Sequence, residues 1–168
     1  MPTPKAKQIV DAIKTRLLAI TEDGGSPVFF YRPDKVAVHP FTKECCDPSI
    51  ATAYVIELDE NEAGEDTTSS NLVRMRYSII GLRKLKIAEH PYNVDPNQPD
   101  RATEQDRLEA DVCNKLLGSA DGITLGGLVE NIAANPIQIH KGPNTFVDGW
   151  AVVFFRFTTQ FTYVRGAA

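Results

Sequence analysis

The chain has 168 residues and a mass of 18.5 kDa, with 42% hydrophobic and 24% charged residues, which is typical of one globular domain spanning residues 1–168. Its net charge of −4 and pI near 5.4 argue against a protein that holds duplex DNA by neutralising the phosphates. Three cysteines form no disulfide framework and no apolar run reaches about 18 residues, so we expect free thiols, synthesis in the cytoplasm and no contact with a membrane.

The N-terminal part of the sequence predicts a helix followed by a strand. Apolar residues recur at three- and four-residue spacing along residues 10–20, which indicates an amphipathic helix with one buried stripe. Thr3 suits its cap and Gly24 its end. Residues 28–31 predict a short strand, and residues 36–48 an irregular connection with room for one more strand. The helix stripe consists of Val10, Ile13, Leu17 and Ile20.

A long β-hairpin is predicted in the middle of the chain. Residues 50–58 are rich in strand-forming residues, and residues 72–82 alternate between apolar and polar side chains. The acidic segment, residues 57–66, has a charge of −6 and leaves −4 + 6 = +2 on the rest of the chain. Its acidic residues are Glu57, Asp59, Glu60, Glu62, Glu65 and Asp66.

A second amphipathic helix is predicted after a long connection. Residues 84–100 contain three prolines, which indicates a surface connection rather than an element. Apolar residues four apart then predict a helix that is capped by Thr103 and ended by Gly118. Cys113 lies on the apolar side of this helix, so we expect it in the core.

Strand-forming residues dominate the C-terminal part. Residues 128–133 and 137–140 predict two strands, with a short helix over residues 124–132 as the alternative for the first. Residues 150–164 form the clearest strand of the sequence, apolar on both faces at its start and therefore central there. Further along, alternation predicts that solvent reaches Thr158, Gln160 and Thr162.

These elements predict an α+β fold. Antiparallel strands joined by turns can bury one face of a sheet, and two amphipathic helices must each bury one stripe. We therefore expect a mostly antiparallel sheet with a long hairpin and a long C-terminal strand, and two amphipathic helices packed on it.

Short catalytic motifs are missing from the sequence. It contains no nucleophile elbow, zinc-protease motif, phosphate-binding loop or dinucleotide-binding glycine pattern. His39, Cys45 and Cys46 are the one close cluster of metal-ligand types, but two vicinal cysteines do not easily place both sulfurs on one ion. We predict no catalytic, metal-binding or cofactor-binding residue.

Charged residues supply the candidates for subunit or partner contacts. The acidic segment suits either a solvated hairpin tip or an interaction segment. Arg74 and Arg76 lie on one face of a predicted strand and, with the following Lys84 and Lys86, suit a surface that meets a neighbouring subunit. The candidate interface residues are therefore Glu57, Asp59, Glu60, Glu62, Glu65, Asp66, Arg74 and Arg76.

The order of elements resembles the tail terminator and tail completion proteins in the neck of long-tailed bacteriophages. The resemblance spans nearly the whole chain and consists of size, element order and the final strand, because that family has no catalytic signature. The segments that carry it are residues 8–20, 28–32, 73–82, 104–117 and 150–163.

The resemblance implies a structural virion protein that is not an enzyme and needs no cofactor. Such a protein forms a homo-oligomeric ring, expected to be a hexamer, on the last ring of the tail-tube protein. It stops tube polymerisation and offers a docking surface to the head–tail connector protein, while DNA only passes through the channel. The resemblance assigns no role to any single residue.

Two other functions remain open at the level of sequence. The first is a head-completion or head–tail connector protein that binds the portal side of the neck. The second is a small metal-dependent nuclease or other cytoplasmic enzyme, in which Asp34, Glu57 and Asp59 would hold divalent ions.

Overall fold

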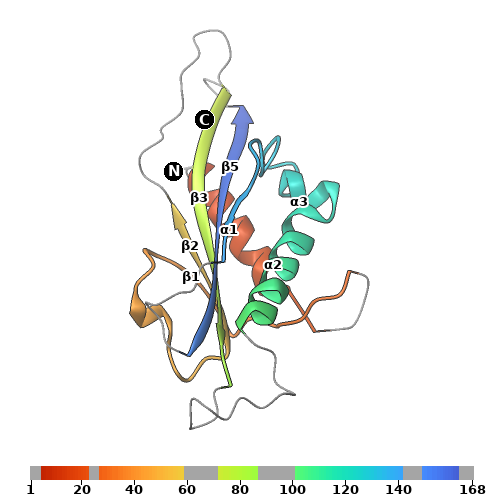
Figure 1. Ribbon diagram of the computed structural model, residues 1–168. Coiled ribbons are helices and arrows are strands. Elements are labelled where there is room, and N and C mark those ends of the chain that lie inside the picture. The colour runs from red at the N-terminus through yellow and green to blue at the C-terminus, as the bar shows by residue number, and fades with distance from the viewer. Residues whose placement is uncertain (1–4, 23–26, 59–71, 87–100, 142–148, 163–168) are drawn as a thin grey trace.

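The protein is a five-stranded mixed sheet with its α-helices packed on one face (Figure 1). The computed structural model describes residues 5–22, 27–58, 72–86, 101–141 and 149–162. The strands are β1 (Lys35–Val38), β2 (Thr52–Leu58), β3 (Leu72–Lys84), β4 (Gln138–His140) and β5 (Trp150–Thr162). The helices are α1 (Lys5–Leu18), α2 (Arg101–Leu117), α3 (Ala120–Thr124) and the 3-10 helix η1 (Lys43–Cys45). This arrangement confirms the predicted α+β class with two amphipathic helices on the sheet.

The two long central strands organise the sheet. Its strand order is β1-β2-β3-β5-β4, in which the β1–β2 pair is parallel and the other pairs are antiparallel. β2 and β3 pair from Thr52 opposite Arg83 to Leu58 opposite Tyr77, which confirms that the strands predicted at residues 50–58 and 72–82 pair antiparallel. β3 and β5 pair over all 13 residues of each strand and so extend beyond the ends of β2 and β4.

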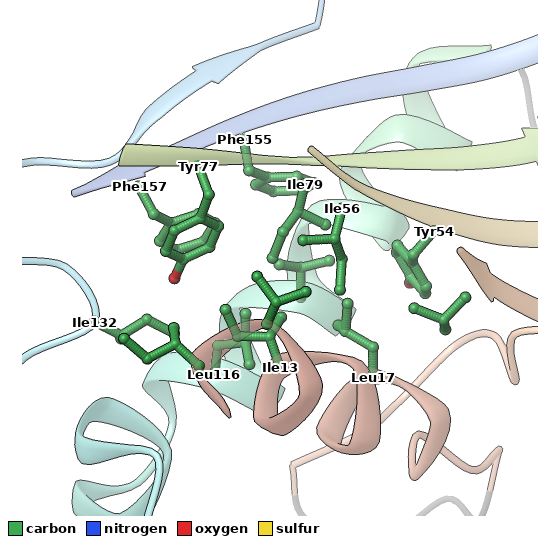
Figure 2. Packing of buried hydrophobic residues seen from close by; sticks show 14 of the residues in the cluster. Ile13, Leu17, Tyr54, Ile56, Tyr77, Ile79, Leu116, Ile132, Phe155 and Phe157 are labelled. Atoms are coloured by element: carbon green, nitrogen blue, oxygen red, sulfur yellow. The ribbon is translucent and has the colours of Figure 1, made fainter. Parts of the chain in front are cut away.

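The main core lies between the sheet and the helices (Figure 2). Tyr77 of β3 and Phe157 of β5 point toward the helices, and their rings stack with centroids 5.4 Å apart. Ile13 and Leu17 of α1 and Leu116 of α2 are fully buried beside the same sheet face. Each such side chain stabilises the fold by about 1.5–3 kcal/mol relative to an exposed one. The predicted apolar stripes of both helices are therefore confirmed, and the half-buried Cys113 packs against this core.

A second, smaller core lies on the opposite face of the sheet. Phe41 packs edge-on against Phe154 of β5, with ring centroids 5.6 Å apart, and Cys45, Cys46 and Ile50 pack beside it. These residues cover the half of the sheet near Trp150, which is why β5 begins with apolar residues on both faces as predicted. The covered residues are Ala53, Val55, Ile80, Leu82, Trp150 and Val152.

Residues 28–31 are not a strand, and that prediction is wrong. The amide N–H of Phe30 donates to Oδ1 of Asp111 at 2.7 Å, and the amide of Tyr31 donates to Oδ2 at 2.9 Å. A carboxylate of α2 thus takes the two hydrogen bonds that a neighbouring strand would have accepted. The short strand allowed for within residues 36–48 does form, as β1.

Residues 128–133 form neither the predicted strand nor the alternative helix. α3 ends at Thr124 because Leu125 has a left-handed backbone, with φ of 48°, and two glycines with positive φ follow it. Beyond this turn, a single bridge joins Asn131 to Gln160 of β5. The strand predicted at residues 137–140 is confirmed as β4.

Two smaller expectations are also corrected. Thr103 is not the cap of the second helix, because α2 already begins at Arg101. Thr158 does not reach solvent: it is 9% exposed and lies directly across from Arg76 on β3.

None of the helices in the described ranges is long and apolar enough to span a membrane.

At Gly81 the backbone of β3 closely approaches the side chains of Tyr54 on β2 and Leu108 on α2. A Cβ at this position would lie 3.3 Å from Cε1 of Tyr54 and 3.7 Å from Cβ of Leu108. We expect Gly81→Val to lower the free energy of unfolding by about 1–3 kcal/mol through overpacking, measured by denaturant titration. Ser78→Val, on the other face of the same strand, should change it by less than about 0.5 kcal/mol. Equal losses in both variants would contradict the close approach as the cause.

Candidate interaction surface on the open sheet face

Three arginines occupy the half of the sheet face that residues 41–50 do not cover. Side chains alternate along a strand, and the neighbours Met75, Tyr77, Phe155 and Phe157 are buried on the helix side. The arginines between them, Arg74, Arg76 and Arg156, therefore lie on the opposite side and are called the arginine face below. The structure brings the two predicted arginines together with one that the sequence analysis missed.

The signal for Arg156 was present in the sequence. It stands between two phenylalanines that are both buried on the helix face, so strand alternation places it on the other face. In the register, Arg156 lies opposite Ser78, one same-face row beyond Arg76. The alternation predicted for residues 150–164 placed Thr158, Gln160 and Thr162 on the open face, and Arg156 lies on that face two residues earlier.

The arginine face is accessible to a partner. Arg74 and Arg156 are exposed and Arg76 is half-buried. The Nε of Arg74 donates to Oε1 of Gln160, directly opposite on β5, at 3.4 Å. Arg74 and Arg76 are two residues apart on β3, roughly 7 Å, and Arg156 lies diagonally across from Arg76 on β5, so the three residues are neighbours on this face.

Of the predicted acidic residues, Glu57 is the one within the described ranges, and it borders the arginine face on the β2 side. Glu57 lies opposite Ser78 in the β2–β3 pair and shares the open face. β2 then ends at Leu58, and β3 begins at Leu72 beside Thr162. The other predicted acidic residues lie outside the described residues: Asp59, Glu60, Glu62, Glu65 and Asp66.

The two lysines that we expected to extend this surface lie elsewhere. Lys84 is eight residues beyond Arg76 on β3, roughly 26 Å along an extended strand. Its Nζ donates to the carbonyl oxygen of Pro48 at 2.7 Å, and Lys86 follows past the end of the strand. The expectation that they join Arg74 and Arg76 in one surface is therefore wrong.

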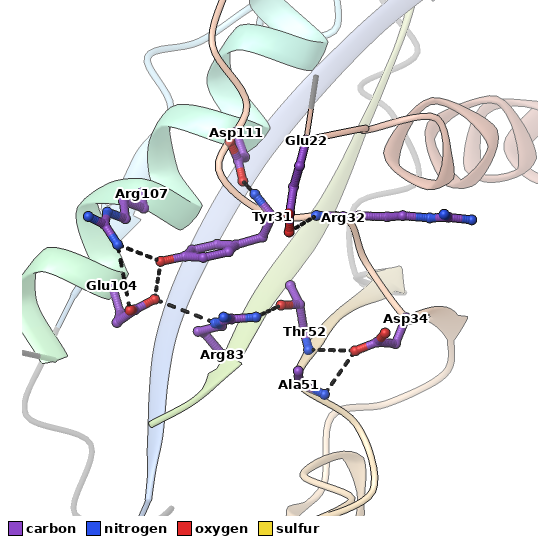
Figure 3. Close-up of polar contacts among 10 residues, drawn as sticks. All are labelled: Glu22, Tyr31, Arg32, Asp34, Ala51, Thr52, Arg83, Glu104, Arg107 and Asp111. Atoms are coloured by element: carbon purple, nitrogen blue, oxygen red, sulfur yellow. Dashed lines mark hydrogen bonds and ion pairs between the residues drawn. The ribbon is translucent and has the colours of Figure 1, made fainter. Parts of the chain in front are cut away.

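A polar cluster on the helix side of the sheet holds the loop before β1 in place (Figure 3). The hydroxyl of Tyr31 donates to Glu104 of α2 and accepts a hydrogen bond from Nη1 of Arg107 at 3.2 Å. Arg83 of β3 lies over the Tyr31 ring, 4.0 Å from its centroid, and donates to Oγ1 of Thr52 at 2.6 Å. Burial, followed by the bond to Glu104, raises the pKa of Tyr31 to about 12. These groups interact with one another and link α2, β3 and β2 to the loop before β1.

A pocket of about 460 Å³ lies beside this cluster. Within it, Oδ2 of Asp34 accepts hydrogen bonds from the amides of Ala51 and Thr52, and these bonds lower the pKa of Asp34. Oε1 of Glu22 accepts the amide of Arg32 at 3.2 Å. The carboxylates of the pocket thus fix the backbone at the start of β2 and in the loop before β1. Its lining residues are Thr21, Glu22, Arg32, Asp34, Ala51 and Arg83.

The carboxylates considered for a nuclease are not brought together. Asp34 lies beside Thr52 at the start of β2, whereas Glu57 lies five residues further along that strand, roughly 17 Å away. Asp59 lies outside the described residues. A two-metal site requires acids that converge on ions about 4 Å apart, and this pair does not meet that requirement.

The histidine–cysteine cluster does not assemble a metal site either. Nδ1 of His39 lies 4.0 Å from Sγ of Cys45, which also accepts the amide of Thr42. Burial raises the pKa of Cys46 to about 11, which keeps its thiol protonated. Across residues 5–22, 27–58, 72–86, 101–141 and 149–162, no group of three His, Cys, Asp or Glu side chains could hold a metal ion.

No protein-family model matches the chain, and no curated protein sequence matches it.

Proposed function

We propose that the protein is a tail terminator of a long-tailed bacteriophage, a structural protein that forms a ring on the end of the tail tube and stops its growth. In this role it also presents the surface on which the head-side connector docks. Five sequence segments that resemble this family fall on α1, the loop before β1, β3, α2 and β5. They are thus distributed over both layers of the fold.

The observation that best supports an assembly role is the division of the second sheet face. Half of that face is buried under residues 41–50, while the other half carries the arginine face at the end of the long β3–β5 pair. A charged, rigid sheet surface of this kind is suited to binding a protein partner. The carboxylates of the pocket and the polar cluster are meanwhile engaged in holding the fold.

The proposed function is tested by adding the purified protein to the tail-tube protein encoded in the same genome. We expect electron microscopy to show ring-shaped caps on tube ends and tubes that stop at a uniform length. Light scattering should give the mass of each component beforehand. Tube protein without the addition is the control, and its tubes should vary widely in length.

Three outcomes would overturn this proposal. Tubes of unchanged length, together with binding to a portal or head preparation, would assign the protein to the connectors of the neck. Hydrolysis of DNA in the presence of magnesium or manganese would assign it to the nucleases. Binding to neither structure would remove it from the neck altogether.

A further inference from the structure

We propose that residues 39–50, called the cover segment below, open away from the sheet as one unit while the rest of the fold stays intact, and so control access to the apolar half of the second sheet face. The segment is orange in Figure 1 and lies on the side of the sheet opposite α1 and α2. This inference goes beyond the proposed function and does not depend on it.

The topology of the sheet leaves the cover segment with spare length. β1 and β2 pair in parallel, so the chain must return from the end of β1 to the start of β2. Val38 lies opposite Ile56, and the return to Thr52 therefore covers four residues of β2, roughly 13 Å. Residues 39–51 can span roughly 40 Å when they are extended. The segment can thus lift from the sheet without pulling either strand out of it.

Both ends of the connection are held by contacts outside the cover segment. Before the segment, β1 pairs with β2 up to Val38. After it, the amides of Ala51 and Thr52 donate to Oδ2 of Asp34 at 2.8 and 3.0 Å. The carbonyl oxygen of Ala51 in turn accepts the amide of Lys84 at 2.8 Å. These contacts provide a fixed point on each side, so opening of the segment leaves the strand pairing in place.

Hydrogen bonds contribute little to holding the cover segment closed. Among the described residues, one hydrogen bond joins it to the rest of the chain, from Nζ of Lys84 to the carbonyl oxygen of Pro48. Its other hydrogen bonds are internal, such as those from the amide of Cys45 to Thr42 and between residues 47 and 49. A segment with internal hydrogen bonds keeps them when it moves as a unit, which favours local opening.

The contacts that close the cover segment are apolar and thin. Phe41 packs edge-on against Phe154, and Cys45, Cys46 and Ile50 pack beside it. These four side chains of the segment are half-buried, whereas the six sheet residues of the second core are 0–6% exposed. Hydrophobic stabilisation follows the area removed from water, so the segment is held less strongly than the fully buried helix stripes. Opening uncovers an apolar patch that is contiguous on the sheet.

The thiol of Cys46 reports on the opening. Burial, followed by the neighbouring Cys45, raises its pKa to about 11, so little thiolate is present at about pH 8 while the segment is closed. Opening brings the thiol into water. Its thiolate then attacks one sulfur of a small disulfide such as dithiobis(nitrobenzoate). A new S–S bond forms and the other half of the reagent leaves as a thiolate, so no further oxidant is needed.

The proposal is tested by the rate of this reaction in the full chain carrying Cys45→Ser, measured by mass spectrometry on the peptide that contains Cys46. We expect Phe41→Ala to raise the rate about tenfold or more, because it weakens the closed state. Ile13→Val, in the main core, should leave the rate within about twofold although it lowers the resistance to urea. Low concentrations of urea should likewise have little effect, because local opening exposes little surface.

Access to the sheet face is measured on the adduct. The reagent bound to Cys46 is too large to return beneath the segment, so the labelled chain should bind an apolar fluorescent dye while its far-ultraviolet circular dichroism stays unchanged. Reduction of the adduct should reverse the dye binding. The matched control carries Cys45→Ser with Cys46→Ser, retains Cys113, and should bind no additional dye after the same treatment.

Three results would overturn the proposal. If Ile13→Val accelerates labelling as much as Phe41→Ala does, the thiol is reached only through global unfolding. If Phe41→Ala leaves the rate unchanged, the reagent reaches the thiol through the closed segment. If the adduct forms without dye binding, the segment does not control access to the sheet face. Phe41→Leu should give a smaller acceleration in the same direction, and it replaces Phe41→Ala if that variant does not fold.

Discussion

Replacing Arg83 with methionine is expected to lower the free energy of unfolding by about 3 kcal/mol, because it removes one partner of a buried ionic group. The Nε of Arg83 lies 3.6 Å from Oε2 of Glu104, whose carboxylate is 9% exposed. The same guanidinium stacks on Tyr31 and donates to Thr52. Methionine preserves much of the volume but leaves the carboxylate with fewer compensating charges. Denaturant-induced unfolding measures the loss.

Two further variants distinguish the ionic contribution from packing. Arg74→Met removes an exposed arginine from the same strand and should change the free energy of unfolding by less than about 0.5 kcal/mol. Adding Glu104→Gln to Arg83→Met should cost at least about 1 kcal/mol less than the sum of the single changes, because the two groups interact directly. Additive losses would contradict the ion pair and assign the effect to lost packing.

Replacing Asp111 with alanine is expected to lower the free energy of unfolding by about 3 kcal/mol, because two amide N–H groups lose their acceptor. The carboxylate is fully buried and binds the amides of Phe30 and Tyr31. Asp111→Asn keeps one acceptor oxygen and should lose about half as much. If the alanine and asparagine variants are equally stable, these hydrogen bonds do not hold the loop.

The same residue is expected to give the protein a distinctive pH dependence. Burial raises the pKa of Asp111 from 3.8 to about 6, against the lowering effect of the two amides. A carboxyl with a raised pKa binds its proton more tightly in the folded state, so its contribution to stability falls as pH rises through about 4 to 6 and is constant above. Other groups titrate in this range, so the difference from Asp111→Asn is the quantity to measure.

From pH 7 to pH 5, the stability of the natural chain relative to Asp111→Asn should increase by roughly 1 kcal/mol. Thermal or denaturant unfolding at both pH values measures this change. A relative stability that decreases on acidification would mean that the two amide hydrogen bonds outweigh burial and that the pKa is lowered. The hydrogen bonds would then stand, but the sign of the pH effect would be wrong.

The elements with strong periodicity were predicted well for a clear physical reason. Apolar residues at helical spacing in α1 and α2, and alternation over residues 73–79 of β3, reflect burial of one side only, and that burial is visible in the sequence. The strand β5 was predicted as central, and it does lie between β3 and β4. In each of these elements the hydrogen bonds come from regular secondary structure, so the local pattern suffices.

The incorrect predictions occurred where a distant residue completes the hydrogen bonding. Residues 28–31 have the composition of a strand, yet Asp111, 80 residues away in the chain, accepts the amide of Tyr31. Residues 128–133 are likewise held by scattered hydrogen bonds rather than by a strand ladder, among them those between Asn131 and Gln160 and from the amide of Ile132 to the carbonyl oxygen of Ile123. Strand propensity describes side chains that fit a sheet, but it does not show whether a neighbouring strand is available.

The candidate interaction surface was predicted in part. Alternation placed Arg74 and Arg76 on one face, and charge counting located the acidic segment, because both are properties of local sequence. The addition of Arg156 and the separation of Lys84 depend on which strands pair and in which register. That register is set by the packing of side chains such as Tyr77 against Phe157, which are far apart in the chain.

The sequence by itself determined the α+β class, the two amphipathic helices, the long antiparallel pair and the uneven distribution of charge, because burial of one face and net charge depend on residue type and spacing. The tertiary structure decided which half of the second sheet face is covered and therefore where three arginines gather. It also decided that Asp111 and Glu104 serve as internal ligands of a loop. Contacts between residues distant in the chain depend on pairing register and on which element lies nearest, and local spacing contains neither.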